Sequence, residues 1–463
     1  MFIGRKNELN ALNERYESKH FEFAVIYGRR RVGKTALIRE FIKNKDCIFF
    51  TGVETNAKQN LQNLSNCIME FKTDMPIGAS FASFQAAFEY VFRLATHRRM
   101  ILVIDEYPYV ARASEGLGSV LQMLIDKNIE TSKLFLILCG SSMSYMEDQV
   151  LAYKAPLYGR RTMQLKIQPF DFFEAIGFLK KFKGYDKALA YGMMGGIPQY
   201  LNQLNDSLSI EENIKNTYLN SSAFIFEEPG NLLKQELREP TNYNAVISAI
   251  ASGASKMNDI SGKVGKTTAD CSGYIKNLMA LDIIKKELPY GEKTNRKSIY
   301  RLEDSMFRFW YRFIPENAFL IMRGATELAY SRIEAELLAY MGEVFEDICK
   351  QYLWKLRFDD KCAVEFMEIG RWWGTNPITK TQEEIDIMGV NQDEALFAEC
   401  KWTNEKVDLG VLEKLIARSE FFRYKQKYFY VFAKTGFTKG CIERAKRMEN
   451  VTLVNYQTML NRR

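Results

Sequence analysis

One glycine-rich stretch near the start of the chain constrains the fold more than any other feature of the sequence. Residues 28–35 read Gly-Arg-Arg-Arg-Val-Gly-Lys-Thr, which matches the pattern GxxxxGK followed by Ser or Thr. An apolar run, 23–27, precedes the stretch, and residues 36–42 follow it with helical spacing. A glycine-rich turn between a buried strand and a helix points backbone N–H groups and the positive helix end at one place. The sequence therefore predicts a loop that holds a polyphosphate.

The residues of this loop have separate expected roles. Lys34 reaches the β- and γ-phosphates, and the Thr35 hydroxyl takes one position around Mg²⁺. The remaining cofactor contacts are expected from the rest of the loop and the first turn of the helix: Gly28, Arg29, Arg30, Arg31, Val32, Gly33 and Ala36. The Asn-Lys-x-Asp pattern that recognises guanine does not occur in the sequence. We therefore expect ATP and Mg²⁺ as the cofactors.

A second apolar run supplies the acidic residues that nucleotide hydrolysis requires. Residues 100–104 are all apolar, and the run is short enough for a strand buried on both faces. The run ends in Asp105 and Glu106. The first carboxylate is placed to hold Mg²⁺ through water, and the second to polarise the attacking water. We therefore predict ATP hydrolysis, with Asp105 at the metal and Glu106 as a catalytic residue.

The composition of the chain argues against several other classes of protein. The chain has 463 residues, a length that suits about three domains, and 47% of its residues are hydrophobic. Its formal net charge is +7, which is only a weak indication of a nucleic-acid partner. The sequence contains no run of roughly 18 apolar residues, so no membrane helix is predicted. The eight cysteines form no CxxC pair, which argues against zinc and against a disulfide framework. With charged residues near the N-terminus, a cytoplasmic location without a membrane partner is expected.

The order of strand-like and helical segments divides the chain into parts. Strand-like runs alternate with helical ones through the first third, which is typical of a parallel sheet with helices on both faces. These runs are 22–27, 47–53, 100–105, 133–140 and 163–168. Helices follow, then three short helices with a hairpin, and finally a second mixture of helices and strands. The predicted domains are a nucleotide-binding core at 1–168, a helical lid at 169–238, a small module at 239–312 and a C-terminal α/β domain at 313–463.

Further segments of the first half resemble one family. Residues 2–9 resemble the adenine-side box of AAA+ and STAND-type ATPases, and residues 137–142 resemble their sensor strand. Residues 158–161 resemble the arginine segment before the last core strand, and residues 195–201 resemble the GxP lid motif. In order and spacing, the set is similar to the archaeal-type ATPase family. Members of that family often carry a C-terminal nuclease-like domain.

This resemblance implies roles for residues outside the loop. Ser142 of the sensor strand and Pro198 of the lid would lie at the nucleotide. Arg160 or Arg161 would be an arginine finger that stabilises charge on the transferred phosphoryl group, and we take Arg160 as the catalytic candidate. A finger that acts in trans requires a homo-oligomer. The structural alternatives stay open: a phosphate-binding or helix-capping arginine, a turn serine, and a proline that shapes the lid whether or not ATP is bound.

The small module has the pattern of a winged helix. Residues 242–252, 256–263 and 266–280 have helical spacing, and segments 283–288 and 298–302 are expected to form a hairpin. The third helix of such a module can enter a DNA major groove, so DNA is an expected partner. Acidic residues dilute its basic patch, and in STAND-type ATPases the winged helix often packs on the core as part of the switch. Both roles stay open, and a regulatory protein is the other candidate partner.

Two strands of the C-terminal domain carry a pair of carboxylates. Segments 384–390 and 395–402 flank four residues with the composition of a hairpin turn. Symmetric pairing about that turn places Asp386 opposite Glu399, with Lys401 on the same face, and leaves the other face for the core. Opposed carboxylates repel each other unless a cation lies between them, and Mg²⁺ prefers oxygen ligands. We therefore expect Asp386 and Glu399 to bind a divalent metal.

The spacing Asp-x(12)-Glu-x-Lys resembles the signature of PD-(D/E)xK nucleases. The resemblance implies catalytic roles for Asp386, Glu399 and Lys401, with the lysine orienting a water or neutralising the scissile phosphate. Residues 342–348 resemble the accessory helix of that family, with Glu346 at the matching position. An exposed acidic hairpin, or a nuclease fold that has lost activity and only binds DNA or a partner, is the alternative.

The expected fold is therefore α/β. It combines a P-loop core with a parallel sheet, a helical lid, a winged-helix module and a C-terminal mixed α/β domain of the restriction-endonuclease type. The expected function is an ATPase coupled to a DNA-directed, nuclease-like domain. The alternative is an ATP-dependent regulatory switch that binds DNA or a partner protein and cuts nothing.

Overall fold

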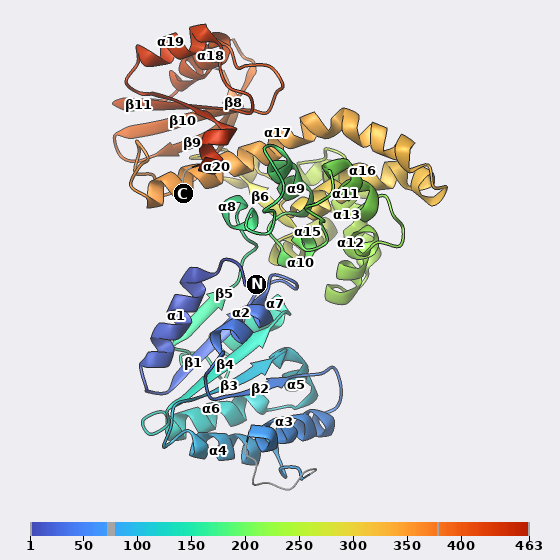
Figure 1. Ribbon diagram of the computed structural model, residues 1–463, viewed down its shortest axis with the longest axis vertical. Helices are drawn as coiled ribbons and strands as arrows, with labels where there is room; N and C mark the ends of the chain where they lie inside the picture. The colour runs from blue at the N-terminus through green and yellow to red at the C-terminus, as the bar shows by residue number, and fades with distance from the viewer. Residues whose placement is uncertain (1, 72–78, 377–378, 462–463) are drawn as a thin grey trace. The chain divides into compact units, whose positions relative to one another are not determined.

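The chain forms two compact units in the computed structural model, which describes residues 2–71, 79–376 and 379–461 (Figure 1). The first unit comprises Met1–Phe170 and Ile197–Gln199, and the second comprises Asp171–Gly196 and Tyr200–Arg463. Within the described residues, no helix has both the length and the apolar character needed to cross a membrane.

A parallel five-stranded sheet forms the centre of the first unit, with the strand order β2-β3-β4-β1-β5. The three central strands are buried along their whole length, as expected when helices cover both faces of a parallel sheet. The five strand predictions are confirmed, although β2 and β5 each end two residues earlier than predicted. The strands are β1 (Glu22–Tyr27), β2 (Cys47–Thr51), β3 (Met100–Asp105), β4 (Leu134–Gly140) and β5 (Met163–Lys166).

Helices cover this sheet because alternate strand residues carry large apolar side chains toward each face. On one face, the side chains of Val25, Leu102 and Leu136 join a single core with the helices that follow β2 and β3. On the other face, Phe41 packs edge-on against Phe135, with 5.8 Å between the ring centroids. The helical segments are α1 (Lys6–Glu17), α2 (Lys34–Phe41), α3 (Ala57–Phe71), α4 (Phe84–Leu94), α5 (Tyr107–Ala113), α6 (Leu117–Asn128), α7 (Met143–Tyr145) and the π-helical turn η1 (Met146–Leu151).

Helices make up the first part of the second unit, except that the first two residues of α10, Pro198 and Gln199, belong to the first unit. The three predicted short helices correspond to α13, α14 and α15, and the predicted hairpin corresponds to β6 and β7, which pair antiparallel. The elements are α8 (Phe172–Ala175), α9 (Asp186–Met194), α10 (Pro198–Leu201), α11 (Ile210–Thr217), α12 (Phe224–Glu236), α13 (Pro240–Ala251), α14 (Met257–Val264), α15 (Thr268–Ala280), β6 (Ile284–Glu287), η2 (Asn295–Lys297) and β7 (Ile299–Leu302).

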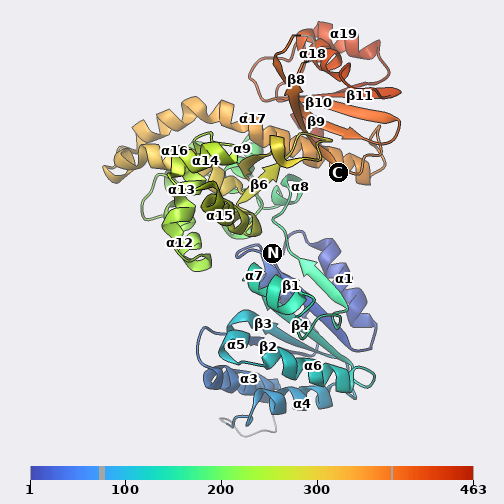
Figure 2. The ribbon, with the colours of Figure 1, turned by 180° about the vertical axis from the view of Figure 1, so that it is seen from behind.

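Two long helices connect this part to the C-terminal sheet. The helix α16 spans Ser305–Met322 and continues across the domain boundary predicted between residues 312 and 313. The helix α17, Thr326–Phe358, has 33 residues and is therefore about 50 Å long. It contacts α9, α11 and α16 as well as strands β9 and β10. Figure 2 shows α17 running from the helical part of this unit to the C-terminal sheet.

The C-terminal sheet is mixed, with the strand order β12-β11-β10-β9-β8. The pairs β8–β9 and β9–β10 are antiparallel, and β10–β11 and β11–β12 are parallel. The elements are β8 (Ile369–Thr375), β9 (Gln382–Val390), β10 (Glu394–Lys401), α18 (Leu409–Ser419), β11 (Gln426–Ala433), α19 (Lys439–Lys446), β12 (Val451–Asn455) and α20 (Tyr456–Asn461).

The prediction that only one face of β9 and β10 forms core was wrong. Met388, Ala395 and Phe397 are on the face assigned to the carboxylates, yet all three are buried. They belong to a core that the residues of α18 complete, while α17 packs against the same two strands. A helix therefore covers each face, and the carboxylates lie within strands whose neighbouring residues are buried on both faces.

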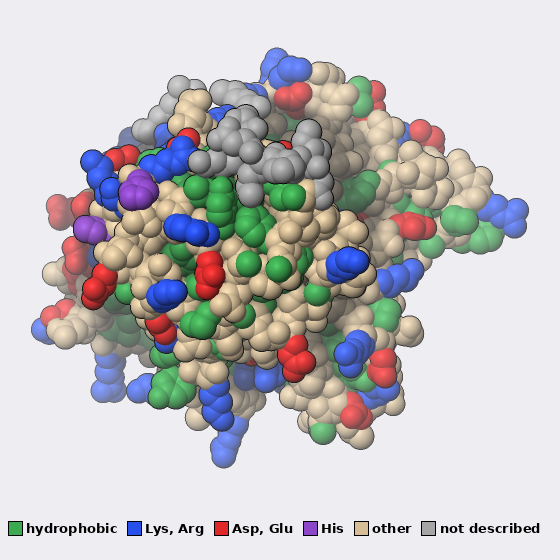
Figure 3. Space-filling model, turned by 90° about the horizontal axis from the view of Figure 1, so that it is seen from below, with side chains coloured by type: hydrophobic (Ala, Val, Ile, Leu, Met, Phe, Trp, Pro, Cys, Tyr) green, Lys and Arg blue, Asp and Glu red, His purple; other side chains and the backbone are tan. Residues whose placement is uncertain are grey.

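Charged side chains of both signs are interspersed over the face shown in Figure 3, with hydrophobic side chains between them. Among the described residues on that face, lysine and arginine do not gather into one patch. This view of the protein therefore does not show the excess positive charge of the chain collected in one place.

Candidate functional site

The loop between β1 and α2 needs its two glycines for different reasons. Gly28 has a φ of 149°, and a Cβ atom there would lie 2.4 Å from the carbonyl oxygen of Ile167. Gly33 has a φ of 93°, and a Cβ atom there would lie 3.6 Å from Cγ of Pro198. The first glycine thus permits a close approach of two backbones, and the second permits a left-handed turn. The proline of the predicted lid motif packs beside the loop.

The ammonium group of Lys34 is held inside the loop. Its Nζ atom donates hydrogen bonds to the carbonyl oxygens of Gly28, at 2.9 Å, and Arg29, at 2.8 Å. The side chain is buried although it carries a charge. Phosphate oxygens are stronger, charged acceptors for the same donor. The loop therefore presents a preformed cation at the position that a triphosphate would occupy.

The two groups predicted to hold Mg²⁺ are in direct contact. The hydroxyl of Thr35 donates to Oδ2 of Asp105 at 2.9 Å, and Oδ1 of Asp105 accepts from the backbone N–H of Glu106 at 3.1 Å. Asp105 lies at the carboxyl end of β3 and is only 4% exposed. A hydroxyl and a carboxylate are suitable ligands for Mg²⁺, which enters such sites with nucleotide phosphates and several waters. The residues present therefore fit the ion.

Glu106 is positioned by a serine that the sequence analysis did not assign. The backbone of Glu106 is left-handed, with a φ of 51°, and its carboxylate accepts from the hydroxyl of Ser141 at 3.0 and 2.9 Å. Ser141 directly follows β4, the neighbour of β3. The predicted sensor residue Ser142 instead accepts from Arg112 at 3.1 Å. Ser141 is thus the residue of the sensor segment that contacts Glu106.

The other loop residues take part in the supporting structure. Arg29 and Val32 are buried, and Arg31 has a left-handed backbone with a φ of 73°. Arg30 donates to the hydroxyl of Tyr109 at 3.1 Å. Ala36 lies in the first turn of α2 and is partly exposed.

An arginine of the N-terminal box fixes the loop from outside. Arg5 is 4% exposed, and its guanidinium donates to the carbonyl oxygens of Val32, at 3.2 Å, and Gln168, at 2.5 Å. The guanidinium also lies 4.1 Å from the ring centroid of Phe170. The segment that resembles the adenine-side box is therefore joined to the loop and to the residues that follow β5.

The candidate finger, Arg160, lies away from the loop of its own chain. It precedes β5, whose first residue Met163 is paired with Ala24 of β1, whereas the nucleotide loop follows the last residue of β1, Tyr27; Arg160 therefore lies toward the other end of the sheet. Its Nε and Nη2 atoms donate to the two carboxylate oxygens of Asp126 at 2.7 and 2.8 Å, and this hydrogen bonding lowers the pKa of Asp126. Arg161 donates to the carbonyl oxygen of Leu151 at 3.4 Å. A finger role for either arginine would therefore require a second chain.

A second group of predicted site residues meets on β9 and β10. The predicted strand register is confirmed from Val390–Ala395 to Ile387–Ala398, and its continuation places Asp386 opposite Glu399. Oδ2 of Asp386 accepts from the backbone N–H of Cys400 at 2.8 Å. Both carboxylates are buried, with exposures of 9% for Asp386 and 6% for Glu399. They are therefore not part of an exposed acidic hairpin.

Two cations neutralise Glu399 in this arrangement. Lys401 donates to Oε1 at 2.5 Å, and Arg418 of α18 donates to Oε2 at 3.3 Å. The sequence analysis anticipated the lysine but not the arginine, which also pairs with Glu383 at 2.9 Å. A divalent ion on Glu399 would therefore compete with a lysine and an arginine already in contact with this carboxylate.

Asp386 and Glu346 differ from Glu399 in their electrostatic surroundings. Burial, together with the nearby charges of Glu399 and Glu346, raises the pKa of Asp386 to about 7, against the effect of Lys401. Burial likewise raises the pKa of Glu346, and its buried Oε2 atom has no hydrogen-bond partner among the described residues. A buried oxygen left unpaired is costly, and a cation between these carboxylates would satisfy it. Asp386 and Glu399 therefore offer oxygen ligands of the kind that a divalent metal prefers.

The fit to a metal has one limit in the part of the chain that is described. Among the described residues, no three or more His, Cys, Asp and Glu side chains lie in an arrangement that could by itself hold a metal ion. An ion at Asp386 would thus need water to complete its coordination, which is usual for Mg²⁺.

Comparison with known proteins indicates the family to which this chain is related. Residues 2–204 match a family described as "ATPase domain predominantly from Archaea", and residues 310–412 match one described as "Archaea bacterial proteins of unknown function". An uncharacterized protein of Methanocaldococcus jannaschii is 32% identical over 445 residues, which cover 94% of this chain and 96% of that protein. An uncharacterized ATP-binding protein of the same organism is 47% identical over 45 residues, covering 10% of this chain and 76% of that protein.

Among solved structures, the Walker-type ATPase of Pyrococcus abyssi has a similar fold, with a TM-score of 0.50 and 20% sequence identity. The likeness covers 67% of this chain and 96% of that chain, and at this identity it shows the shared fold alone. The nucleotide loop lies inside the matched ATPase domain, and the M. jannaschii relative spans nearly the whole chain. This chain therefore belongs to the archaeal-type ATPase family.

Proposed function

We propose that this P-loop ATPase controls a nuclease-like C-terminal domain that acts on DNA. The observation that carries the proposal is the buried pair Asp386 and Glu399 on adjacent strands, with Lys401 in contact with Glu399. Two buried, opposed carboxylates reduce stability unless a bound cation or a proton compensates them. Lys401 and Arg418 compensate Glu399, so Asp386 is the carboxylate that a bound cation or a proton would still have to compensate.

At the nucleotide site, each residue has one task in the proposed mechanism. Lys34 would leave the carbonyl oxygens of its own loop and pair with the β- and γ-phosphates. Thr35 and Asp105 would hold Mg²⁺, which neutralises charge on the phosphates. Glu106 would accept a proton from the attacking water, and the hydrogen bond from Ser141 would aim its carboxylate before the reaction.

At the C-terminal site, Asp386 and Glu399 would hold a divalent metal, and the buried Oε2 atom of Glu346 would accept a hydrogen bond from a water at this site. When bound, such an ion supplies positive charge next to a scissile phosphate. Lys401 would exchange its contact with Glu399 for one with the phosphate or the attacking water. Asp386 must be deprotonated to bind the ion, so a pKa near 7 would make metal binding stronger above neutral pH.

The other parts of the second unit would connect the two sites. We assign α8 to α12 as the lid, and α13 to α15 with the hairpin β6–β7 as a winged helix. The proposed domains are 1–168, 169–238, 239–312 and 313–463. DNA is the proposed partner of the winged helix and of the C-terminal domain, and a second copy of the chain is the proposed source of an arginine finger.

A cleavage assay tests the nuclease proposal. Supercoiled plasmid would be incubated with the full chain and Mg²⁺ or Mn²⁺, beside Lys401→Ala and a matched control, Lys425→Ala, at an exposed lysine near the same hairpin. Metal-dependent nicking by the wild type and by Lys425→Ala, but not by Lys401→Ala, is expected. Nicking that persists in Lys401→Ala, or that needs no metal, would contradict the assignment.

One observation favours a second function. Lys401 and Arg418 already satisfy both oxygens of Glu399, so this carboxylate is stable without a metal. In the alternative function, the ATPase is a switch whose C-terminal domain binds DNA or a partner protein and cuts nothing. Nucleotide-dependent DNA binding by both wild type and Lys401→Ala, without nicking by either, would support this alternative.

A further inference from the structure

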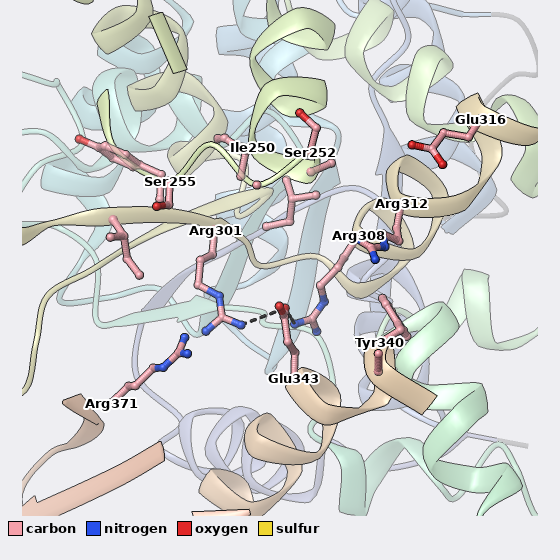
Figure 4. Close-up of a pocket in the computed structure, with 16 residues that line it drawn as sticks. Ile250, Ser252, Ser255, Arg301, Arg308, Arg312, Glu316, Tyr340, Glu343 and Arg371 are labelled. Atoms are coloured by element: carbon pink, nitrogen blue, oxygen red, sulfur yellow. Dashed lines mark ion pairs between the residues drawn. The ribbon is translucent and has the colours of Figure 1, made fainter. Parts of the chain in front are cut away.

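A cavity in the second unit gathers arginines from three elements. Its volume is about 610 Å³, within the roughly 300–1,000 Å³ typical of small-molecule sites. Figure 4 shows the arginine side chains converging on the cavity from β7, α16 and the start of β8, with Glu343 of α17 among them. Neither the nucleotide loop nor the Asp386 carboxylate lines this cavity.

The lining carries more positive than negative charge. Four arginines line the cavity, against two carboxylates. The arginines are Arg301, Arg308, Arg312 and Arg371, and the carboxylates are Glu316 and Glu343. Hydroxyls of Ser252 and Ser255 and an apolar wall that includes Ile250 and Leu302 complete it. Guanidinium groups bind phosphate oxygens in a bidentate manner, so the walls suit a ligand with phosphates and an apolar part.

Glu343 takes the position of an anion in this cavity. Its carboxylate lies 2.9 Å from Nη2 of Arg301 and 3.7 Å from Nη1 of Arg308, and the dashed lines of Figure 4 mark these pairs. The glutamate side chain is 53% exposed, whereas Arg301 and Arg308 are only 15% and 10% exposed. The carboxylate can therefore swing into solvent, while the arginines stay in place.

The deeper arginine retains unused donor capacity. Arg308 pairs with Asp347 behind the cavity at 3.1 Å, but its Nε–H has no hydrogen-bond partner among the described residues. Arg312 lies one turn further along α16 and is half exposed, paired with Glu336 at 2.6 Å. Arg371 pairs with Glu384. The three cations Arg301, Arg308 and Arg312 could thus reach one anionic ligand without losing their places in the fold.

We propose that this cavity binds a phosphorylated small molecule of nucleotide size, whose phosphate displaces Glu343 from Arg301 and Arg308. A small molecule fits better than a DNA backbone, because Arg308 is almost fully buried. Cations that bind a duplex backbone meet the phosphates at the protein surface. The proposal does not depend on the nuclease assignment.

Calorimetric titration of the full chain tests the proposal. All proteins carry Lys34→Ala, which weakens anion binding at the nucleotide loop. The probes are adenosine 3′,5′-bisphosphate, inorganic phosphate and a short single-stranded oligonucleotide. We expect saturable binding of the bisphosphate with a stoichiometry of one, weaker binding of phosphate, and no competition by the oligonucleotide.

Two variants move the affinity in opposite directions. Arg312→Ala should weaken bisphosphate binding about tenfold, which is the effect of losing one charged hydrogen bond. Glu343→Gln should tighten it about threefold or more, because the competing carboxylate is gone. Arg323→Ala, at the exposed end of α16 and outside the cavity, is the matched control and should bind as the parent does. Thermal melts check that every variant is folded.

The opposite effects of Arg312→Ala and Glu343→Gln on the affinity for the bisphosphate distinguish a binding site from a cluster of structural ion pairs. No saturable binding by the parent, equal affinities of Arg312→Ala and Arg323→Ala, or weaker binding by Glu343→Gln would each overturn the proposal. Binding of the oligonucleotide alone would also overturn it, and would reassign the cavity to nucleic acid.

Discussion

Replacing Asp386 by asparagine should stabilise the protein at high pH. The side chain is buried beside Glu399 and Glu346, and its pKa is raised from 3.8 to about 7. The folded state holds this proton more tightly than the unfolded state does. The stabilisation that the proton provides is therefore complete below pH 4 and is lost progressively between pH 4 and 7. The loss amounts to about 4 kcal/mol at most, at 1.36 kcal/mol for each unit of pKa. Asparagine has the same shape and carries no charge.

The assay can follow this unit alone. All five tryptophans lie between residues 310 and 402, so tryptophan fluorescence during urea unfolding reports on the second unit. Asp386→Asn should unfold at a higher urea concentration than the wild type at pH 8, and the difference should be less than half as large at pH 5. The control Asp393→Asn, in the exposed turn of the same hairpin, should show no such pH dependence.

Adding Mg²⁺ or Mn²⁺ at pH 8 should narrow the difference in stability between the two proteins. A ligand that binds only the folded state stabilises it by about 2.7 kcal/mol at 100 times its dissociation constant, and only the wild type retains the charged ligand. The reasoning would be refuted by a variant no more stable than the wild type at pH 8. An identical response of the two proteins to metal would refute the metal site alone.

Four variants test the ATPase part of the chain. Lys34→Ala should abolish ATP hydrolysis and weaken ATP binding, measured by phosphate release and by calorimetry; normal turnover would exclude the loop assignment. Glu106→Gln should bind ATP but hydrolyse it about 10²–10⁴-fold more slowly, and Ser141→Ala should show a smaller loss of about tenfold with unchanged affinity; an inactive Ser141→Ala that no longer binds ATP would point to misfolding instead. Arg160→Ala should lower turnover only at concentrations where chains associate; a concentration-independent loss of affinity would make it a structural partner of Asp126.

The sequence alone predicted the features that depend on local pattern. The strands β1, β3 and β4 each contain a run of at least five consecutive apolar residues, and such runs suit a sheet that is covered on both faces. The register of β9 and β10 followed from the position of the turn, because symmetric pairing about four turn residues leaves one arrangement. For the same reason, the pairing of Asp386 with Glu399 followed from residue spacing.

Features that depend on distant parts of the chain could not be predicted in this way. Ser141 and Ser142 are adjacent, and only the direction of the chain after β4 decides which hydroxyl meets Glu106. The partner of Arg160, Asp126, is on a helix 34 residues away. Arg418 reaches Glu399 from α18, and no local pattern connects an arginine on that helix to a carboxylate on β10.

The most direct test of the proposed coupling is the rate of plasmid cleavage in different nucleotide states. Initial nicking rates would be measured with Mg²⁺ and no nucleotide, ADP or ATP, for the wild type and for Glu106→Gln, which should hold ATP without hydrolysing it. We predict that the nicking rate of the wild type depends on which nucleotide is present. Glu106→Gln with ATP should nick at the constant rate of the ATP-bound state. A nicking rate that is the same in every nucleotide state, or zero in all of them while ATP is hydrolysed, would contradict ATP control of a nuclease.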